Sequence, residues 1–268
     1  MSAVATAGPR PFAATGKLTR NGLTLAWRSV TQLRHSPEKL IDTLLIPIIF
    51  MTLFLYVFGG AVAGDTHSYL QQLLPGLMAQ MAMFGTMGLG TRLAEDINKG
   101  VFDRFRSLPI GRSAPLIGAV LGETVRFVLS VIVTLGFGLL LGFRFTGTTP
   151  LNIAAGVLVT YVFFLAVSWI SVLFGMTAPS PDTVQGISFL WVMPLTFGSS
   201  VFLADTSTMP GWLQSWVEVN PVTHLSDTLR WAFTGAPLGD HLWWTLVWSA
   251  ALTVTAFPLA LRAYTRRS

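Results

Sequence analysis

Residues 92–126 read RLAEDINKGVFDRFRSLPIGRSAPLIGAVLGETVR, and this charged stretch sets the topology of the chain. Acidic and basic residues alternate over its first half, and the sequence on either side is almost wholly apolar. Backbone that crosses a bilayer must satisfy its own hydrogen bonds, so the apolar flanks predict membrane helices. A charged hairpin between two such helices lies in water at one membrane face, where another protein can bind it.

The composition places the chain in the membrane class. Of its 268 residues 52% are hydrophobic and only 11% are charged, against about a quarter charged in a soluble domain. There is no cysteine, which excludes a disulfide framework and a thiolate metal site. The formal charge is +5, but the basic residues stand beside apolar runs, a pattern typical of membrane topology rather than nucleic-acid binding.

The N-terminal region divides into a tail and an amphipathic helix. Residues 1–16 are small, polar and rich in Pro and Gly, which predicts a disordered cytoplasmic tail without a signal peptide. Residues 17–36 carry apolar side chains at helical spacing with Arg20, Arg28 and Arg34 between them. This pattern favours a basic helix lying on the membrane surface, and an ordinary solvated lead-in helix is the alternative.

Six apolar runs predict an all-α polytopic membrane protein with six transmembrane helices. Each is about as long as the roughly 20 residues that span a bilayer. Within a transmembrane domain of residues 37–266, the predicted spans are residues 43–64, 69–91, 116–142, 151–176, 183–204 and 241–261.

The stretch between the last two spans, residues 205–240, is unusual for a loop. It contains Trp212, Trp216 and Trp231, and tryptophan is enriched at membrane interfaces. Asn220-Pro221 divides it in two. We expect two short amphipathic helices that form a re-entrant segment on the outer side.

The distribution of basic residues predicts the orientation. Six lysines and arginines precede the first span, five lie in the hairpin and three in the C-terminal tail, whereas the opposite loops hold only Arg144 and Arg230. Cytoplasmic loops carry the excess of Lys and Arg. Both termini and the hairpin are therefore predicted to be cytoplasmic, which an even number of spans requires.

Motifs for several other functions are missing or incomplete. Residues 16–18 read GKL, so no Walker A motif is present, and there is no HExxH. The four histidines are scattered, and no metal site or catalytic residue is predicted. Gly198-Ser199-Ser200 in the fifth span, upstream of His224, would suit an intramembrane serine protease, but Phe202 breaks the G-x-S-x-G spacing and disfavours that class.

The hairpin resembles the cytoplasmic signature of type-2 ABC transporter permeases, in particular the daunorubicin/doxorubicin-resistance membrane-protein group. The segments SPDTVQGISFLWVMPLTFGSSVF and MPGWLQSWVEVNPVTHLSD resemble the fifth span and the outer segment of the same group. The resemblance extends over nearly the whole chain after about Ser36. The hairpin positions that match the signature are Gly100, Asp103, Arg104, Arg106, Leu108, Pro109, Arg112, Gly118 and Arg126.

The resemblance implies a division of labour. This chain would be the permease of an ATP-driven exporter in the plasma membrane, bound by lipid, and would not itself be an enzyme or bind a cofactor or nucleic acid. Two copies of a separate ABC ATPase would hydrolyse ATP with Mg²⁺, and a second permease copy or a paralogue would complete the dimer. An amphipathic small molecule such as an antibiotic is the expected cargo. A lipid-linked sugar or polysaccharide is the alternative cargo, and a secondary transporter is the alternative class.

The resemblance also assigns a coupling role to the hairpin, where a plain solvated loop is the alternative. Phe102 and Phe105 at helical spacing favour a docking surface over a connector. The residues predicted to couple the permease to the ATPase are Glu95, Asp96, Lys99, Gly100, Asp103, Arg104, Arg106 and Pro109.

Four residues are candidates for the transport path or its gate. Glu123 and Arg126 are three apart on one face of the third span, where charges are costly and usually functional. We expect them to pair or to face the dimer partner, with snorkelling to the headgroups as the alternative. Asn220 and Pro221 are the outer candidates. The Asp227–Arg230 pair is interpreted as structural.

Overall fold

The structure is a computed structural model, and it describes residues 37–100, 114–203, 205–207 and 209–266. These residues form eight helices and no strand, which confirms the all-helical class. The predicted tail, the amphipathic helix at residues 17–36 and residues 101–113 of the hairpin lie outside the described residues. The helices are α2 (Pro37–Ala63), α3 (Thr66–Asn98), α5 (Ala114–Leu140), α6 (Pro150–Thr177), α7 (Pro181–Phe197), α8 (Gly211–Val219), α9 (Pro221–Thr234) and α10 (His241–Arg266).

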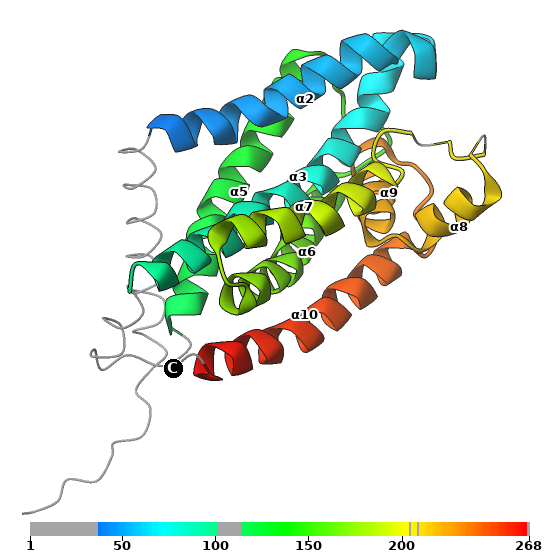
Figure 1. Ribbon diagram of the computed structural model, residues 1–268. Coiled ribbons are helices and arrows are strands. Elements are labelled where there is room, and N and C mark those ends of the chain that lie inside the picture. Colours follow the sequence, from blue (N-terminus) through cyan, green and yellow to red (C-terminus); the bar gives the residue numbers. More distant parts are fainter. Residues whose placement is uncertain (1–36, 101–113, 204, 208, 267–268) are drawn as a thin grey trace, which may run out of the picture.

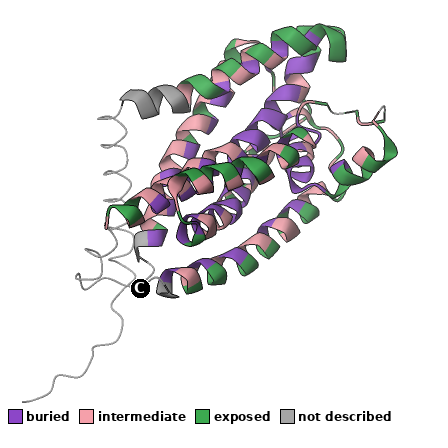
Figure 2. Ribbon diagram, viewed as in Figure 1, coloured by how far each residue is buried: buried purple, intermediate pink, exposed green. Residues whose placement is uncertain are grey.

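Helix α3 is the centre of the bundle (Figure 1). It packs against α2, α5, α6, α7 and α9, and α6 in turn packs against α10. Its sequence is apolar and rich in methionine around the whole helix, as expected of a helix covered on every side. Buried residues accordingly concentrate on α3, α6 and α9, while α2 and α10 turn exposed faces outward (Figure 2).

The exposed faces are themselves apolar. Leu53 on α2, Leu190 on α7 and Val254 on α10 are half or more exposed. A soluble protein does not present such large apolar surfaces to water, whereas lipid covers them without cost. Within the part of the chain that the structure describes, five helices are long and apolar enough to cross a membrane: Leu44–Ala63, Thr66–Asn98, Leu116–Leu140, Pro150–Thr177 and His241–Tyr264.

The predicted fifth span differs most from the structure. Instead of continuing through residues 183–204, helix α7 ends at Phe197 and has 17 residues, so it is shorter than a spanning helix. Gly198 stands at its C-cap, and the side chain of Asn220 donates to the carbonyl oxygens of Leu195 and Gly198 at 2.8 Å each. The outer segment confirms the prediction of two short helices, α8 and α9, which meet at Asn220.

Two glycines allow α3 and α6 to cross at close range. A Cβ on Gly90 would lie 2.5 Å from the backbone oxygen of Ser171, and one on Gly175 would lie 2.6 Å from the oxygen of Gly90. The Ser171 hydroxyl donates to the carbonyl of Thr86 at 2.5 Å. Close backbone approach with small residues and interhelical hydrogen bonds is how membrane helices associate without a hydrophobic drive.

This crossing predicts the effect of one added methyl group. Gly90→Ala should lower the free energy of unfolding by about 2 kcal/mol, because backbone atoms rather than a side-chain tip must move. Gly136→Ala on α5 is the matched control, since a Cβ there meets nothing within 4 Å. The measurement is the thermal unfolding midpoint of both purified variants in detergent. Equal midpoints for the two variants would contradict the close crossing.

Candidate functional site

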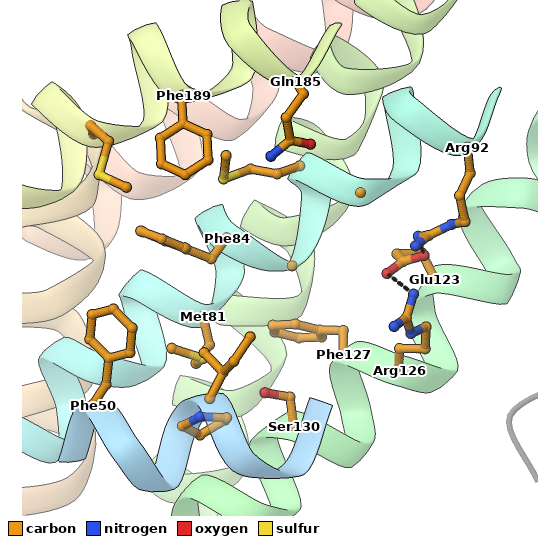
Figure 3. A pocket seen from close by; sticks show the side chains of 16 residues that line it. Phe50, Met81, Phe84, Arg92, Glu123, Arg126, Phe127, Ser130, Gln185 and Phe189 are labelled. Atoms are coloured by element: carbon orange, nitrogen blue, oxygen red, sulfur yellow. Dashed lines mark hydrogen bonds and ion pairs between the residues drawn. The ribbon is translucent and has the colours of Figure 1, made fainter. Parts of the chain in front are cut away.

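A cavity of about 600 Å³ lies where α2, α3, α5 and α7 meet (Figure 3). Because α2, α5 and α7 all pack against α3, that helix forms the floor. Four phenylalanines and three methionines line the wall, and one end of the cavity is charged. The lining residues are Ile46, Pro47, Phe50, Met81, Phe84, Gly85, Met87, Gly88, Arg92, Glu123, Arg126, Phe127, Ser130, Gln185, Phe189 and Met193.

The charged end consists of Arg92, Glu123 and Arg126, here called the ion triad. The Glu123 carboxylate is buried, with its side chain 8% exposed. Its Oε2 atom binds the Arg92 guanidinium, and its Oε1 atom lies 3.7 Å from Nη1 of Arg126 (Figure 3). The pairing of Glu123 with Arg126 was predicted from their spacing, and neither side chain has to reach the headgroups for a counter-ion. With all three groups ionised, the triad carries one net positive charge.

The local sequence explains how Arg92 reaches α5. A helical side chain leans toward the N-terminus of its helix, so Arg92 lies over the turn that contains Gly88. A Cβ on Gly88 would be 2.9 Å from Nη1 of Arg92, which shows that the guanidinium occupies the space left by the glycine. Sequence reasoning missed this residue, because Arg92 and Glu123 are 31 positions apart and no spacing rule relates them. The triad therefore joins the end of α3 to the start of α5, on both sides of the hairpin.

The structure describes half of the predicted coupling residues. Helix α3 continues beyond Thr91 to Asn98, so Glu95 and Asp96 stand on its last turns. Lys99 pairs with Glu95 at 3.3 Å on the exposed surface. Gly100 has φ +66°, a left-handed conformation that ends the helix and turns the chain into the hairpin. The other four, Asp103, Arg104, Arg106 and Pro109, lie outside the described residues, and the coupling role stays a prediction.

The structure does not bring Asn220 and Pro221 to the cavity. Asn220 is buried, and besides its bonds to the end of α7 its Oδ1 accepts from the backbone N–H of Val222 at 2.9 Å. It therefore caps the start of α9 as well as the end of α7. Pro221 stands at the first position of α9, where its missing N–H costs nothing. A role for the two residues in the transport path remains a prediction.

The buried Arg230 ties α9 to the segment that follows α7. It donates to Asp227 at 2.5 Å and to the hydroxyl and carbonyl oxygens of Ser200 at 3.0 and 2.5 Å. The structural interpretation of the Asp227–Arg230 pair agrees with these contacts. Ser200 also donates to Asp227 at 3.2 Å. The Nδ1 atom of His224 faces that of His241 at 3.1 Å rather than a serine hydroxyl, so these contacts do not form a Ser-His nucleophile pair.

Asn220 caps both the end of α7 and the start of α9, here called the dual cap, and this predicts the effect of changing it. Asn220→Asp keeps the acceptor for the α9 N-terminus but replaces the donating amide by a carboxylate facing two carbonyl oxygens. It should lower the free energy of unfolding by about 2 kcal/mol, at least as much as Asn220→Ala. Binding of an ATPase partner at the other end of the bundle should be unaffected. Glu218→Gln, an exposed change on α8, is the control, and thermal unfolding with pull-down measures both effects. An Asn220→Asp protein as stable as the control would contradict the dual cap.

Residues 21–234 match the family described as ABC-2 type transporter. The chain belongs to the ABC-2 type transporter family. It is 40% identical over 265 residues to the daunorubicin resistance ABC transporter permease protein DrrB1 of Streptomyces coeruleorubidus, covering 99% of this chain and 92% of that protein. It is 28% identical over 262 residues to the probable doxorubicin resistance ABC transporter permease protein DrrC of Mycobacterium tuberculosis, covering 97% and 91%.

A third relative is more distant. The inner membrane transport permease YadH of Escherichia coli is 25% identical over 206 residues, which cover 73% of this chain and 77% of that protein. Together with the span-length apolar helices, membership of the ABC-2 family identifies this chain as a permease component of a transport system and a multi-pass protein of the plasma membrane. It also implies an ATPase partner, which supplies the energy in an ABC system.

Proposed function

We propose that this ABC-2 permease exports an amphipathic small molecule such as an antibiotic. The cavity carries the proposal: its volume of about 600 Å³ falls within the roughly 300–1,000 Å³ of small-molecule sites. Its wall of Phe and Met side chains suits a flat apolar body, and its charged end suits a polar group. The names of the two drug-resistance relatives support the same class of cargo.

The energy comes from a separate chain in this proposal. Two copies of an ABC ATPase bind ATP and Mg²⁺ and dock on the hairpin that follows α3. Supporting observations are the exposed charges of Asp96 and Lys99 at the end of α3 and the ion triad directly behind them. A movement of the hairpin would be transmitted to Arg92 through α3 and to Glu123 through α5. The docked ATPase could in this way change the shape of the cavity.

The proposal includes six membrane elements with both termini in the cytoplasm and a dimer of permease subunits. Five span-length helices, with α7 and the turn after it as the sixth membrane element, fit an even number of crossings with both termini in the cytoplasm. A second permease copy would pair with this one. The apolar, half-exposed side chains of Ile46 on α2 and Phe189 on α7, at the rim of the cavity, support a partner surface there.

Export is tested in inside-out vesicles that contain the permease together with its ATPase. ATP-dependent uptake is measured for two fluorescent amphiphiles, daunorubicin and anilinonaphthalene sulfonate. Uptake of at least one of them, absent from vesicles with the ATPase alone, is the expected result. Uptake of neither, with a lipid-linked sugar accumulating inside instead, would contradict the proposed cargo class.

A further inference from the structure

We infer that the contact between His224 and His241 is a proton-sensitive latch, which holds the start of α10 against α9 at neutral pH and releases it on acidification. His224 lies near the start of α9, and His241 is the first residue of α10. The two helices pack against each other. The latch is independent of which molecule the permease exports.

One hydrogen bond joins the two rings. The Nδ1 atoms of His224 and His241 are 3.1 Å apart, and the ring centroids are 5.4 Å apart. The bond needs a proton on one Nδ1 atom and a lone pair on the other, because an imidazole nitrogen that carries a proton cannot accept. When both rings are protonated, neither Nδ1 atom can accept and two positive charges face each other. The contact therefore breaks when the second ring takes up its proton.

The carboxylate beside the rings cannot compensate two positive charges. The Oδ2 atom of Asp227 lies 3.8 Å from Nδ1 of His241. Its Oδ1 atom binds Arg230 at 2.5 Å and accepts from the hydroxyl of Ser200 at 3.2 Å. The single negative charge thus already faces a guanidinium. Because His224 is buried, an uncompensated charge on its ring is costly.

Other ionisable residues at this end of the bundle do not hold the two rings. Tyr69 of α3 donates its hydroxyl to the carbonyl of Phe202 and is neutral at physiological pH. Among the residues that the structure describes, Asp227 is the one acid in ion-pair contact with either ring. The remaining ionisable side chains on or beside the elements at this end are exposed: Asp65 and His67 at the start of α3, Arg144 before α6, Asp205 after α7, Glu218 on α8 and Asp240 before α10.

The direction of the pH effect follows from His224. Burial lowers its pKa below the ordinary value of about 6.5, the charge of His241 lowers it further, and Asp227 acts in the opposite direction. The ring therefore binds a proton more tightly once the latch is open. The contact contributes its full stability above the ordinary pKa and loses it as the pH falls below about 6.5.

Opening of the latch would extend beyond the two rings. The hydroxyls of Thr228 on α9 and Thr245 on α10 are 3.4 Å apart, one turn further along both helices, and would separate next. Helix α9 is also joined to the end of α7 through Asn220. Since α7 contributes to the wall of the cavity, acidification would loosen the support of that wall.

Hydrogen exchange followed by mass spectrometry tests the latch. The purified full-length permease in nanodiscs of uncharged lipid is labelled at about pH 7.5 and about pH 5.5, on either side of the ordinary histidine pKa, with labelling times scaled for the effect of pH on chemical exchange. The amides of residues 244–250 should exchange roughly tenfold faster at the lower pH, whereas those of α6 should not change. Equal scaled exchange of residues 244–250 at both pH values would overturn the inference.

The variants assign the acid response to the two rings. His224→Gln does not titrate, and its amide can donate or accept, so it can bond to His241 in either protonation state. Its scaled exchange should be the same at both pH values. His241→Gln should behave in the same way, and it replaces His224→Gln if that variant fails to fold. His67→Gln removes an exposed histidine and should keep the full response. A response that persists in His224→Gln or His241→Gln would overturn the inference.

Two further measurements separate a proton from other causes. The chain has four histidines, so each can be followed by NMR with isotope-labelled histidine. His224 should titrate below about pH 6.5, and His241→Gln should raise its midpoint; a parent midpoint at or above the ordinary value would overturn the inference. EDTA at about pH 7.5 should leave exchange unchanged. Faster exchange with EDTA would assign the contact to a bound metal ion and overturn the proton latch.

Discussion

Asp103→Arg combined with Arg104→Asp reduces drug export to the level of vesicles without the permease, while the amount of folded protein in the membrane stays unchanged. The two residues belong to the hairpin that we propose as the docking site of the ATPase. Reversing two adjacent charges leaves the net charge of the chain the same but opposes like charges at the contact, which costs several kcal/mol in a docked interface.

Efflux per unit of permease measures the effect of this reversal. Transport should fall roughly hundredfold, and the copurified ATPase should be lost with it. Arg144→Asp, a reversal at an exposed position between α5 and α6, should leave both unchanged. Normal efflux by the double variant at equal expression would contradict the coupling role of the hairpin.

Arg230→Met should have the largest effect on stability in the described part of the chain. The substitution leaves the partly buried Asp227 without its arginine partner and removes the donors to both oxygens of Ser200. Removing one member of a buried ion pair costs about 3–5 kcal/mol, so the variant should unfold during purification or melt far below the parent protein.

Two companion variants show that the charge left behind causes the loss. Asp227→Leu added to Arg230→Met should recover part of the stability, because no buried charge then remains unpaired. Lys99→Met removes the cation of the exposed Lys99–Glu95 pair and should change the free energy of unfolding by less than about 0.5 kcal/mol. A double variant less stable than Arg230→Met alone would show that the side chains matter through packing instead.

The fold class could be predicted because it depends on composition over long windows. The scarcity of charge and the apolar runs determine which segments can enter a membrane, and local sequence decides this. The break at Asn220-Pro221 was equally local, because Pro stands at the first position of a new helix. The end of α7 is only partly local, because Gly198 stands at its C-cap but the amide that bonds the carbonyl of Leu195 comes from a residue 25 positions later.

Part of the candidate site was likewise predictable from local sequence, and part depends on how the helices pack. The pairing of Glu123 with Arg126 follows from a spacing of three on one helix, so the sequence was enough to predict it. The participation of Arg92 depends on how α3 and α5 pack across the intervening hairpin, and the cavity depends on four helices at once. The one local signal for Arg92 is Gly88, one turn earlier, which leaves space for the guanidinium. This signal can be interpreted only once the position of α5 is known.

The central claim is that this ABC-2 permease works with a separate ATPase through the hairpin after α3. The most direct test is a pull-down through a C-terminal tag from detergent-solubilised membranes, with the eluate assayed for ATPase activity. An ATPase of separate sequence should copurify with the parent protein and be lost when residues 95–106 are replaced by a Gly/Ser linker. An eluate that contains no ATPase, or one that keeps it after the replacement, would contradict the coupling through this hairpin.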